Sequence, residues 1–194
     1  MKVEVLWEYG YGPALFGLGL SYGLTSDYYI FETGWRGQIY ERLCRVSQRC
    51  AKKGNGEEKF LRMIQIWADV TAPRFWWQEF DTYKVGTVSL SESTMHTLGK
   101  RPLTPEDFET PIEPGYLDTL NSALRTDNAI DFKGMLPEGF LQRRIVNFNY
   151  AVLANMIRQR SKHKLPQWRQ FLTEVRANVA KPEFLPEIEG EEKE

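Results

Sequence analysis

Two asparagines and one arginine in the C-terminal part of the chain have the types and spacing of a polar binding site. Asn149, Asn155 and Arg160 lie in a segment whose apolar residues have helical spacing. At about 100° per residue, Asn149 and Arg160 fall close to one face of that helix, and Asn155 is displaced from their line but still adjacent. Amide and guanidinium groups on a partly apolar face must find hydrogen-bond partners, and a guanidinium fork matches phosphate oxygens. The pattern indicates either a site for a phosphorylated ligand or a set of helix caps and surface groups.

Several common catalytic patterns are missing from the sequence. It has no P-loop or HExxH motif, and the glycines between Gly10 and Gly23 lack the full dinucleotide-binding spacing. We interpret these glycines as tight turns or close packing. Cys44 and Cys50 fall on separated faces of a predicted helix and are not expected to bridge, and no Cys/His cluster suggests zinc. We therefore expect no catalytic nucleophile and no metal site.

The charge of the chain is balanced in total but uneven along its length. The 194 residues carry a formal net charge of −1, which argues against a strongly basic coat protein. Residues 142–176 contain eight Lys or Arg and one Glu, whereas residues 181–194 contain six Glu and two Lys. The basic segment is either a solvated face or a track for phosphates. Because no apolar run is long enough to span a membrane and no signal-peptide core is present, we expect a cytoplasmic protein.

Hydrophobic periodicity predicts an α+β protein in which helices dominate. We expect a single domain over residues 1–180, with a small sheet flanked by long helices, and a disordered acidic tail over residues 181–194. The predicted strands are 2–7 and 63–70. A predicted helix that carries residues 74–80 has Thr71 as its N-cap and Pro73 in its first turn. The other predicted helices are 37–52, 116–124, one across 145–156, and one that starts at Pro166. Loops or turns are predicted at 52–57, 83–98 and 134–137, and a helix start at 104–107.

The C-terminal half of the chain resembles the flavin-dependent thymidylate synthases. The resemblance rests on the run Lys133-Gly134-Met135-Leu136-Pro137, on Asn149, Asn155 and Arg160 at the family's spacing, and on Gln167-Trp168 after one extra residue. Upstream, residues 69–80 are similar to the helix that leads into the family's Arg-His-Arg signature. Thr82-Tyr83-Lys84 stand in place of that signature, Ser93 matches its later serine after one inserted residue, and Met95-His96 replace Arg-Tyr.

The resemblance covers most of residues 1–175, and residues 2–27 are similar to compact, phage-type members, which would act in the host cytoplasm. It implies a homotetramer whose active sites lie between subunits. It also implies that FAD takes reducing equivalents from NADPH and passes hydride during methylation of dUMP to dTMP, with methylenetetrahydrofolate as the carbon donor. In such a protein the cofactors carry the chemistry and the chain positions them.

The resemblance also assigns roles by position. The residues that would contact the flavin are Tyr83, Lys84, Asn149 and Asn155. The residues that would hold the nucleotide are Gln78, Glu92, Ser93, Lys133 and Arg160.

Several cations of the family pattern are absent from this chain. Thr82, Met95 and Ala151 stand where the family has arginines, while Lys84 and Lys133 keep the charge but lose the bidentate fork. Because each charge-assisted hydrogen bond contributes about 1.5–3 kcal/mol, FAD binding is expected to be weaker. Three functions stay open: a synthase or closely related pyrimidine-nucleotide enzyme, a divergent non-synthase that binds a nucleotide or a partner protein, and a nucleic-acid-binding module that uses residues 142–176.

Overall fold

An antiparallel sheet of four strands lies at the centre of the protein. The computed structural model describes residues 1–23, 38–54, 56–98, 100–125 and 129–188. The strands are β1 (Lys2–Tyr9), β2 (Gln65–Pro73), β3 (Thr87–Ser91) and β4 (Leu141–Asn149). Their spatial order is β1-β2-β4-β3, so that β2 and β4 form the central pair.

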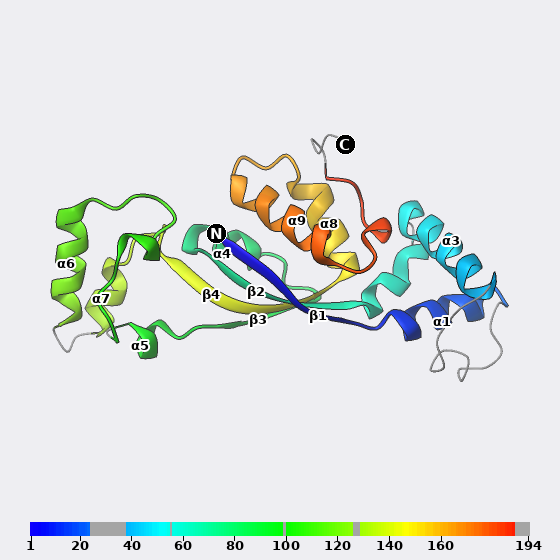
Figure 1. The fold of residues 1–194 in the computed structure, drawn as a ribbon, viewed down its shortest axis with the longest axis horizontal. Coiled ribbons are helices and arrows are strands. Elements are labelled where there is room, and N and C mark those ends of the chain that lie inside the picture. The colour runs from blue at the N-terminus through cyan, green and yellow to red at the C-terminus, as the bar shows by residue number, and fades with distance from the viewer. Residues whose placement is uncertain (24–37, 55, 99, 126–128, 189–194) are drawn as a thin grey trace.

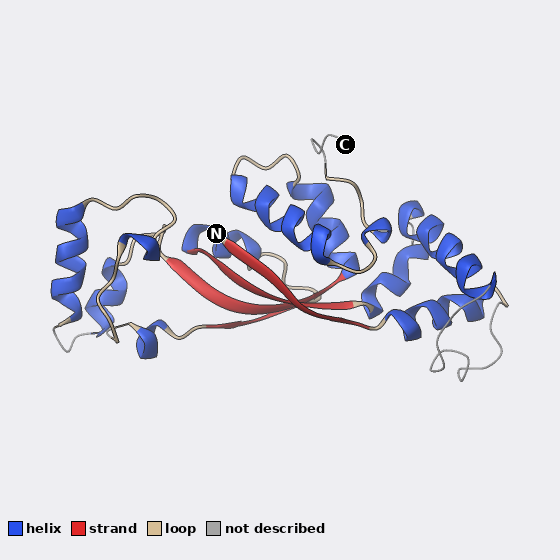
Figure 2. Cartoon of the chain, in the orientation of Figure 1, coloured by secondary structure: helices blue, strands red, loops and turns tan. Residues whose placement is uncertain are grey.

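Helices lie over one face of this sheet and beyond its two ends. They are α1 (Tyr11–Ser21), α3 (Gln38–Lys53), α4 (Arg74–Phe80), α5 (Thr94–Thr97), α6 (Pro114–Leu124), α7 (Ala129–Met135), α8 (Tyr150–Arg160) and α9 (Pro166–Asn178), with 3₁₀ turns η1 (Glu57–Met63), η2 (Pro105–Asp107) and η3 (Pro182–Phe184). Helices α4, α8 and α9 cover one face, α1 and α3 lie at one end, and α5, α6 and α7 lie at the other (Figure 1, Figure 2). The predicted α+β class is confirmed.

The main core lies between the sheet and the three helices on its face. Ile66, Ala68 and Val70 alternate along β2 and are fully buried, as expected of a strand with one face against helices. Above them, Trp76 of α4 packs with its ring centroid 4.9 Å from that of Trp168 of α9. This aromatic contact joins α4 to α9, and it fixes the position of the polar residues that follow Trp76 in the chain.

A second, smaller apolar cluster holds the end of the molecule that contains α6 and α7. Its buried residues are Leu103, Phe108, Leu120, Phe132, Leu136 and Phe140. β4 starts immediately after Phe140 and ends beneath α8, so it links the two clusters.

The predicted helix across 145–156 is wrong, because its first part is a strand. β4 pairs with β2 along its full length, and α8 starts only after it. Ile145 and Phe148 fit a helical period, but Val146 and Phe148 fit the alternation of a strand, and pairing with a buried central strand decides between the two. Asn149 then ends the strand and caps the helix, because its Oδ1 accepts a hydrogen bond from the Val152 backbone N–H at 3.0 Å.

Residues 83–98, predicted as a loop, contain β3 and α5. The glycine-rich residues 10–23, predicted as tight turns or close packing, contain α1. β3 is an edge strand whose Val88 and Leu90 are exposed, so it has no buried apolar face that a sequence pattern could reveal.

Several predicted boundaries also shift. β2 runs from Gln65 to Pro73, so Thr71 belongs to the strand and Pro73 is the N-cap of α4. The turn predicted at 134–137 starts inside α7, and the helix start predicted at 104–107 is the single turn η2 with a capping box at Thr104.

The described part of the expected tail packs against the rest of the protein. Phe184, Leu185 and Ile188 are buried, and η3 contacts α3. Residues 189–194 lie outside the described residues, as do residues 24–27 of the segment that resembles phage-type members.

The start of α1 tests the close packing predicted for the glycines. Gly10 has φ +104°, and a Cβ there would overlap the carbonyl oxygen of Met63, whereas Gly17 in the middle of α1 has open space around it. We expect Gly10→Ala to lower the free energy of unfolding by more than about 1 kcal/mol and Gly17→Ala to raise it by about 0.5–1 kcal/mol. Chemical denaturation of both variants measures the two changes, and a stable Gly10→Ala protein would contradict the packing at Gly10.

Candidate functional site

Glu79, at the end of α4, lies at the centre of a polar cluster between α4, α8 and α9. Its Oε2 accepts a hydrogen bond from the indole Nε1–H of buried Trp168 at 2.8 Å. The same oxygen lies 3.2 Å from Nη1 of Arg160 and 3.4 Å from Nε2 of His163. One carboxylate therefore holds together three side chains from the end of α8, the connecting turn and the start of α9.

Arg160 is further positioned by Tyr83, from the loop that follows α4. Its Nε donates to the Tyr83 hydroxyl at 3.0 Å, and its guanidinium lies 5.1 Å from the ring centroid of Trp168. The Tyr83 hydroxyl donates to Gln159 at 2.9 Å, and Gln159 donates to Asn155 Oδ1 at 3.1 Å. A chain of hydrogen bonds therefore runs along the exposed side of α8. We name these seven residues the α8 cluster: Glu79, Tyr83, Asn155, Gln159, Arg160, His163 and Trp168.

One hydrogen bond fixes the orientation of the His163 ring. Its Nδ1 accepts from the Leu165 backbone N–H at 3.2 Å, so Nε2 is the ring nitrogen that faces Glu79. Glu79 and Arg160 carry opposite charges, which offset each other within the cluster.

The loop that carries Tyr83 and Lys84 lies against the start of α8. Gly86 has φ +80°, and a Cβ there would lie 2.9 Å from Val152 Cγ2 and 3.0 Å from Asn149 Nδ2. Only glycine suits both this conformation and this approach. Tyr83, Lys84, Asn149 and Asn155, the residues predicted to contact a flavin, are therefore all on α8 or on the loop beside it.

The residues predicted to hold a nucleotide are more widely spread. Arg160 is in the α8 cluster, whereas the exposed Gln78 donates to Glu138 at 2.8 Å. Ser93 is the N-cap of α5, and exposed Lys133 is in α7, which packs on α5. Within one chain, the described contacts do not bring Ser93 or Lys133 to Arg160.

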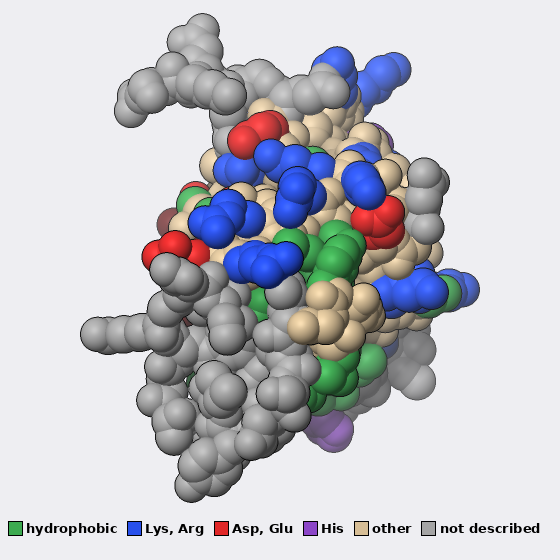
Figure 3. Space-filling model, turned by 90° about the vertical axis from the view of Figure 1, so that its right-hand side faces the viewer, with side chains coloured by type: hydrophobic (Ala, Val, Ile, Leu, Met, Phe, Trp, Pro, Cys, Tyr) green, Lys and Arg blue, Asp and Glu red, His purple; other side chains and the backbone are tan. Residues whose placement is uncertain are grey.

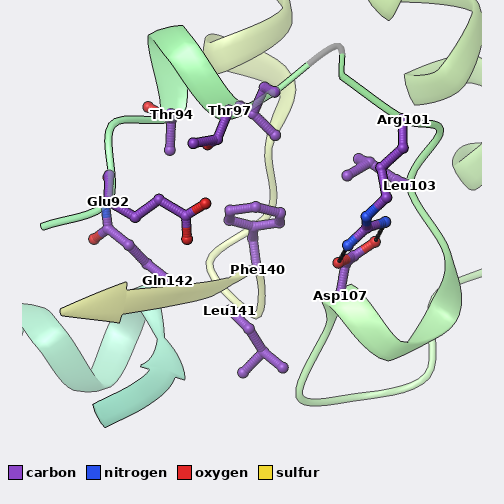
Figure 4. Close-up of a pocket in the computed structure, with 10 residues that line it drawn as sticks. Glu92, Thr94, Thr97, Arg101, Leu103, Asp107, Phe140, Leu141 and Gln142 are labelled. Carbon is purple, nitrogen blue, oxygen red and sulfur yellow. Dashed lines mark hydrogen bonds and ion pairs between the residues drawn. The ribbon is translucent and has the colours of Figure 1, made fainter. Parts of the chain in front are cut away.

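Glu92, also predicted to hold the nucleotide, lines a small cavity between α5 and the start of β4. Glu92 and Phe140 face each other across it, and Arg101 and Asp107 pair on its other side (Figure 4). It encloses about 130 Å³, below the roughly 300–1,000 Å³ of typical small-molecule pockets. On its own it would therefore hold only part of a ligand.

The charges around this cavity do not suit a phosphate. The Arg101 guanidinium is bidentate to Asp107, with N–O distances of 2.7 and 2.5 Å. Burial raises the pKa of Asp107, but hydrogen bonds from Arg101 and the Thr104 backbone N–H outweigh it, so the pKa lies below its usual value. The pair is therefore neutral at pH 7, and the carboxylate of Glu92 favours hydrogen-bond donors such as those of a nucleobase.

At two of the three positions where the family pattern has an arginine and this chain does not, the side chain makes contacts within the protein. Thr82 Oγ1 donates to the carbonyl of Glu79 at 2.7 Å, and Ala151 packs partly buried against the core. The side chain of Met95 lies outside the described part of the chain. No group of three or more His, Cys, Asp or Glu side chains in the described residues is placed to hold a metal ion.

The sequence did not identify several members of these sites. The missed residues are Glu79, Gln159, His163, Trp168, Arg101 and Asp107. The Thr104–Asp107 capping box was visible as a helix start, but nothing in the sequence pairs Glu79 with residues about eighty positions away.

Removing the carboxylate of Glu79 is expected to destabilise the protein. Glu79→Ala leaves the Trp168 indole N–H buried without an acceptor, which lowers the free energy of unfolding by about 1–3 kcal/mol. Glu79→Gln keeps a hydrogen-bond acceptor for the Trp168 indole and should lower the free energy of unfolding by a smaller amount. The control is Glu138→Ala, at an exposed carboxylate, which should change stability by less than about 0.5 kcal/mol. Equal losses in Glu79→Ala and Glu138→Ala, measured by urea denaturation, would contradict the role of Glu79.

Comparisons with known proteins identify the fold. No family model and no curated protein sequence matches the chain. Among solved structures, it is similar to Thymidylate Synthase X (ThyX) from Helicobacter pylori with FAD and dUMP, at a TM-score of 0.74 and 15% identity, covering 97% of this chain and 98% of that one. A second structure of flavin-dependent thymidylate synthase ThyX from Helicobacter pylori, also complexed with FAD and dUMP, gives a TM-score of 0.73 and 15% identity over 94% and 95% of the two chains. The chain therefore has the fold of the flavin-dependent thymidylate synthases.

Proposed function

We propose that this chain is a divergent flavin-dependent thymidylate synthase, or an enzyme of a closely related pyrimidine-nucleotide modification, that binds FAD and a dUMP-like nucleotide. The proposal rests on a fold match over nearly the whole of both chains, at low identity, to a protein solved with FAD and dUMP. The α8 cluster supports it, because it presents hydrogen-bond donors on one side of a helix.

The donors of α8 are the observation that carries this proposal. Arg160 Nη2, Asn149 Nδ2 and Asn155 Nδ2 have no acceptor among the described residues, although each side chain is oriented by its other atoms. Exposed Lys84 lies on the adjoining loop. Oriented donors without acceptors fit the oxygens of a phosphate or of a flavin ring. The residues present therefore fit these ligands.

Arg160 would hold the nucleotide phosphate with a guanidinium that is already oriented. Its side chain is 22% exposed, and Glu79 and Tyr83 fix two of its nitrogens. Glu79 also neutralises part of its charge, so a phosphate would compete with this carboxylate for the guanidinium. The Trp168 indole N–H donates to the same Glu79 oxygen and would reduce that competition.

The remaining chemistry would come from the bound cofactors. FAD would supply hydride transfer, with NADPH as the source of reducing equivalents and methylenetetrahydrofolate as the carbon donor. The chain would orient the flavin through Tyr83, Lys84, Asn149 and Asn155. Glu92, with Gln78, Ser93 and Lys133, would contribute to the nucleotide site.

Ligand binding tests the proposal. We expect the purified chain to bind FAD in the presence of dUMP, seen as visible flavin absorption. Arg160→Ala should weaken dUMP binding about 10- to 100-fold, because a charge-assisted hydrogen bond contributes about 1.5–3 kcal/mol. Arg158→Ala, at an exposed arginine on the same helix, should bind dUMP as wild type does.

Each outcome of this experiment has a defined meaning. If FAD does not bind even with dUMP, the synthase proposal is wrong and the divergent non-synthase function, which the missing arginines favour, takes its place. If FAD binds but no dTMP forms with NADPH and the folate donor, the related modification is supported. Unchanged dUMP affinity in Arg160→Ala would overturn the phosphate role of Arg160.

A homo-oligomer is part of the proposal, and the second face of the sheet supports it. Residues opposite the buried positions of β2 and β4 point away from α8 and α9, and three of their cross-strand neighbours, Trp7, Val88 and Leu90, are apolar and exposed. Leu90 is 74% exposed, Val88 64%, and Trp7 57%. An exposed apolar sheet face indicates a protein interface. Ser93 and Lys133 do not come close to Arg160 within one chain. A second copy could bring Ser93 and Lys133 of one chain to Arg160 of another.

A charge on this face should dissociate the oligomer. We expect wild-type protein to be a tetramer and Leu90→Glu to shift it to smaller species, because the charge would be buried at the interface. Val85→Glu is the matched control, since Val85 lies in the loop before β3 and is 88% exposed. Light scattering after size exclusion measures both, and a monomeric wild type would contradict the expectation.

The basic segment 142–176 gives little support for the nucleic-acid alternative. Its residues divide mainly between β4, α8 and α9, and at least four of its eight cations are in ion pairs. The pairs are Arg143–Asp69, Arg144–Asp81, Arg160–Glu79 and Arg176–Glu187.

No helix among the described residues has the length and apolar character needed to cross a membrane.

A further inference from the structure

A stripe of cations covers the solvent side of α3, far from the α8 cluster. We define the α3 stripe as Arg42, Arg45, Arg49, Lys52 and Lys53, all of which are exposed. At about 100° per residue these positions fall within an arc of about 100°, and at 1.5 Å per residue they extend over about 16 Å. Figure 3, which faces this end of the molecule, shows Lys and Arg side chains gathered on it.

The opposite side of α3 fixes the direction of the stripe. Leu43, Val46, Ser47 and Cys50 are buried, and Ala51 continues the same face. The helix is therefore held to the protein by its apolar side, and its cations point to solvent. No apolar side of α3 is left to insert into a lipid bilayer, as an interfacial membrane helix requires.

Most of the charge in the α3 stripe is not balanced. Arg45 lies 3.8 Å from Glu41, and Lys53 lies 3.0 Å from Glu57, both pairs being exposed. Arg42, Arg49 and Lys52 have no ion pair within the described ranges. Exposed helix pairs contribute only about 0.3–0.5 kcal/mol, so even the paired cations remain available to another anion.

The positive surface continues from α3 onto α8. Lys52 and Arg158 line a hollow of about 370 Å³ between α3, α8 and the segment after η3. Glu183 and Glu187 also line it, but they pair with Lys181 and Arg176, at 3.6 and 2.9 Å. The carboxylates of this hollow therefore have cations of their own and do not neutralise the stripe.

We propose that the α3 stripe binds the phosphate backbone of a nucleic-acid duplex without reading its sequence. A convex row of cations about 16 Å long suits an extended polyanion rather than a small anion, which would need a concave site. Phosphates along one strand of a duplex are spaced about 3.4 Å apart along its axis, so several of them can face the stripe at once. This surface is separate from the proposed enzymatic site and does not depend on it.

Salt dependence tests the proposal on the full-length chain. We expect the affinity for a short fluorescent DNA duplex, measured by anisotropy, to fall about 40-fold between about 50 and 200 mM salt if three phosphates are contacted. The triple variant Arg42→Gln/Arg49→Gln/Lys52→Gln should bind at least about tenfold more weakly at the lower salt concentration and lose most of this salt dependence. It should unfold at the same urea concentration as wild type, which separates this result from loss of folding and does not require the chain to bind FAD or dUMP.

A second triple variant controls for net charge. Lys100→Gln/Arg125→Gln/Lys164→Gln removes the same number of exposed cations elsewhere on the described surface and should bind the duplex as wild type does. Equal weakening by both triple variants, or no duplex binding by wild type at low salt, would overturn the proposal. Binding to phosphatidylserine vesicles that depends on the α3 stripe, without duplex binding, would also overturn it in favour of a membrane surface.

Discussion

The arrangement of the candidate site depends on a single carboxylate that a buried indole holds in place. Trp168 packs in the aromatic core and has one polar atom, which must be hydrogen-bonded because it is removed from water. Glu79 meets that requirement, and its charge in turn attracts Arg160 and His163. The packing of the core therefore determines the position of the Arg160 guanidinium at the surface. The guanidinium is oriented before any ligand arrives, which reduces the entropy lost on binding.

The sequence was informative where one local signal decided the structure. β1, α3, α6 and α9 were predicted because their apolar residues repeat with one period and their ends carry recognisable residues. The segment before α8 was mispredicted because strand and helix periods both fit it, and only its pairing with β2 decides. β3 was missed for a related reason, since its apolar residues face away from the core.

The grouping of the candidate residues was predictable to a similar degree. Spacing places Asn155 and Arg160 on one helix, and the family resemblance adds the loop with Tyr83 and Lys84. The partners of these residues did not, because Glu79 and Trp168 reach Arg160 only through the packing of three helices. Asn149 had been placed on the helix face, whereas the structure makes it the cap. Helix capping and ligand contact are compatible in this one residue, because the cap uses only the amide oxygen.

Asn149 shows how these two roles can be separated chemically. Its oxygen caps α8, and its nitrogen lies beside Gly86 without an acceptor in the described structure. Aspartate caps a helix as well as asparagine does and adds a favourable charge at the helix start. The helix by itself therefore gives no reason to prefer the amide over the acid. A bound molecule with a negatively charged or carbonyl oxygen would give such a reason. Its oxygen would attract the amide N–H and would repel the second carboxylate oxygen of an aspartate.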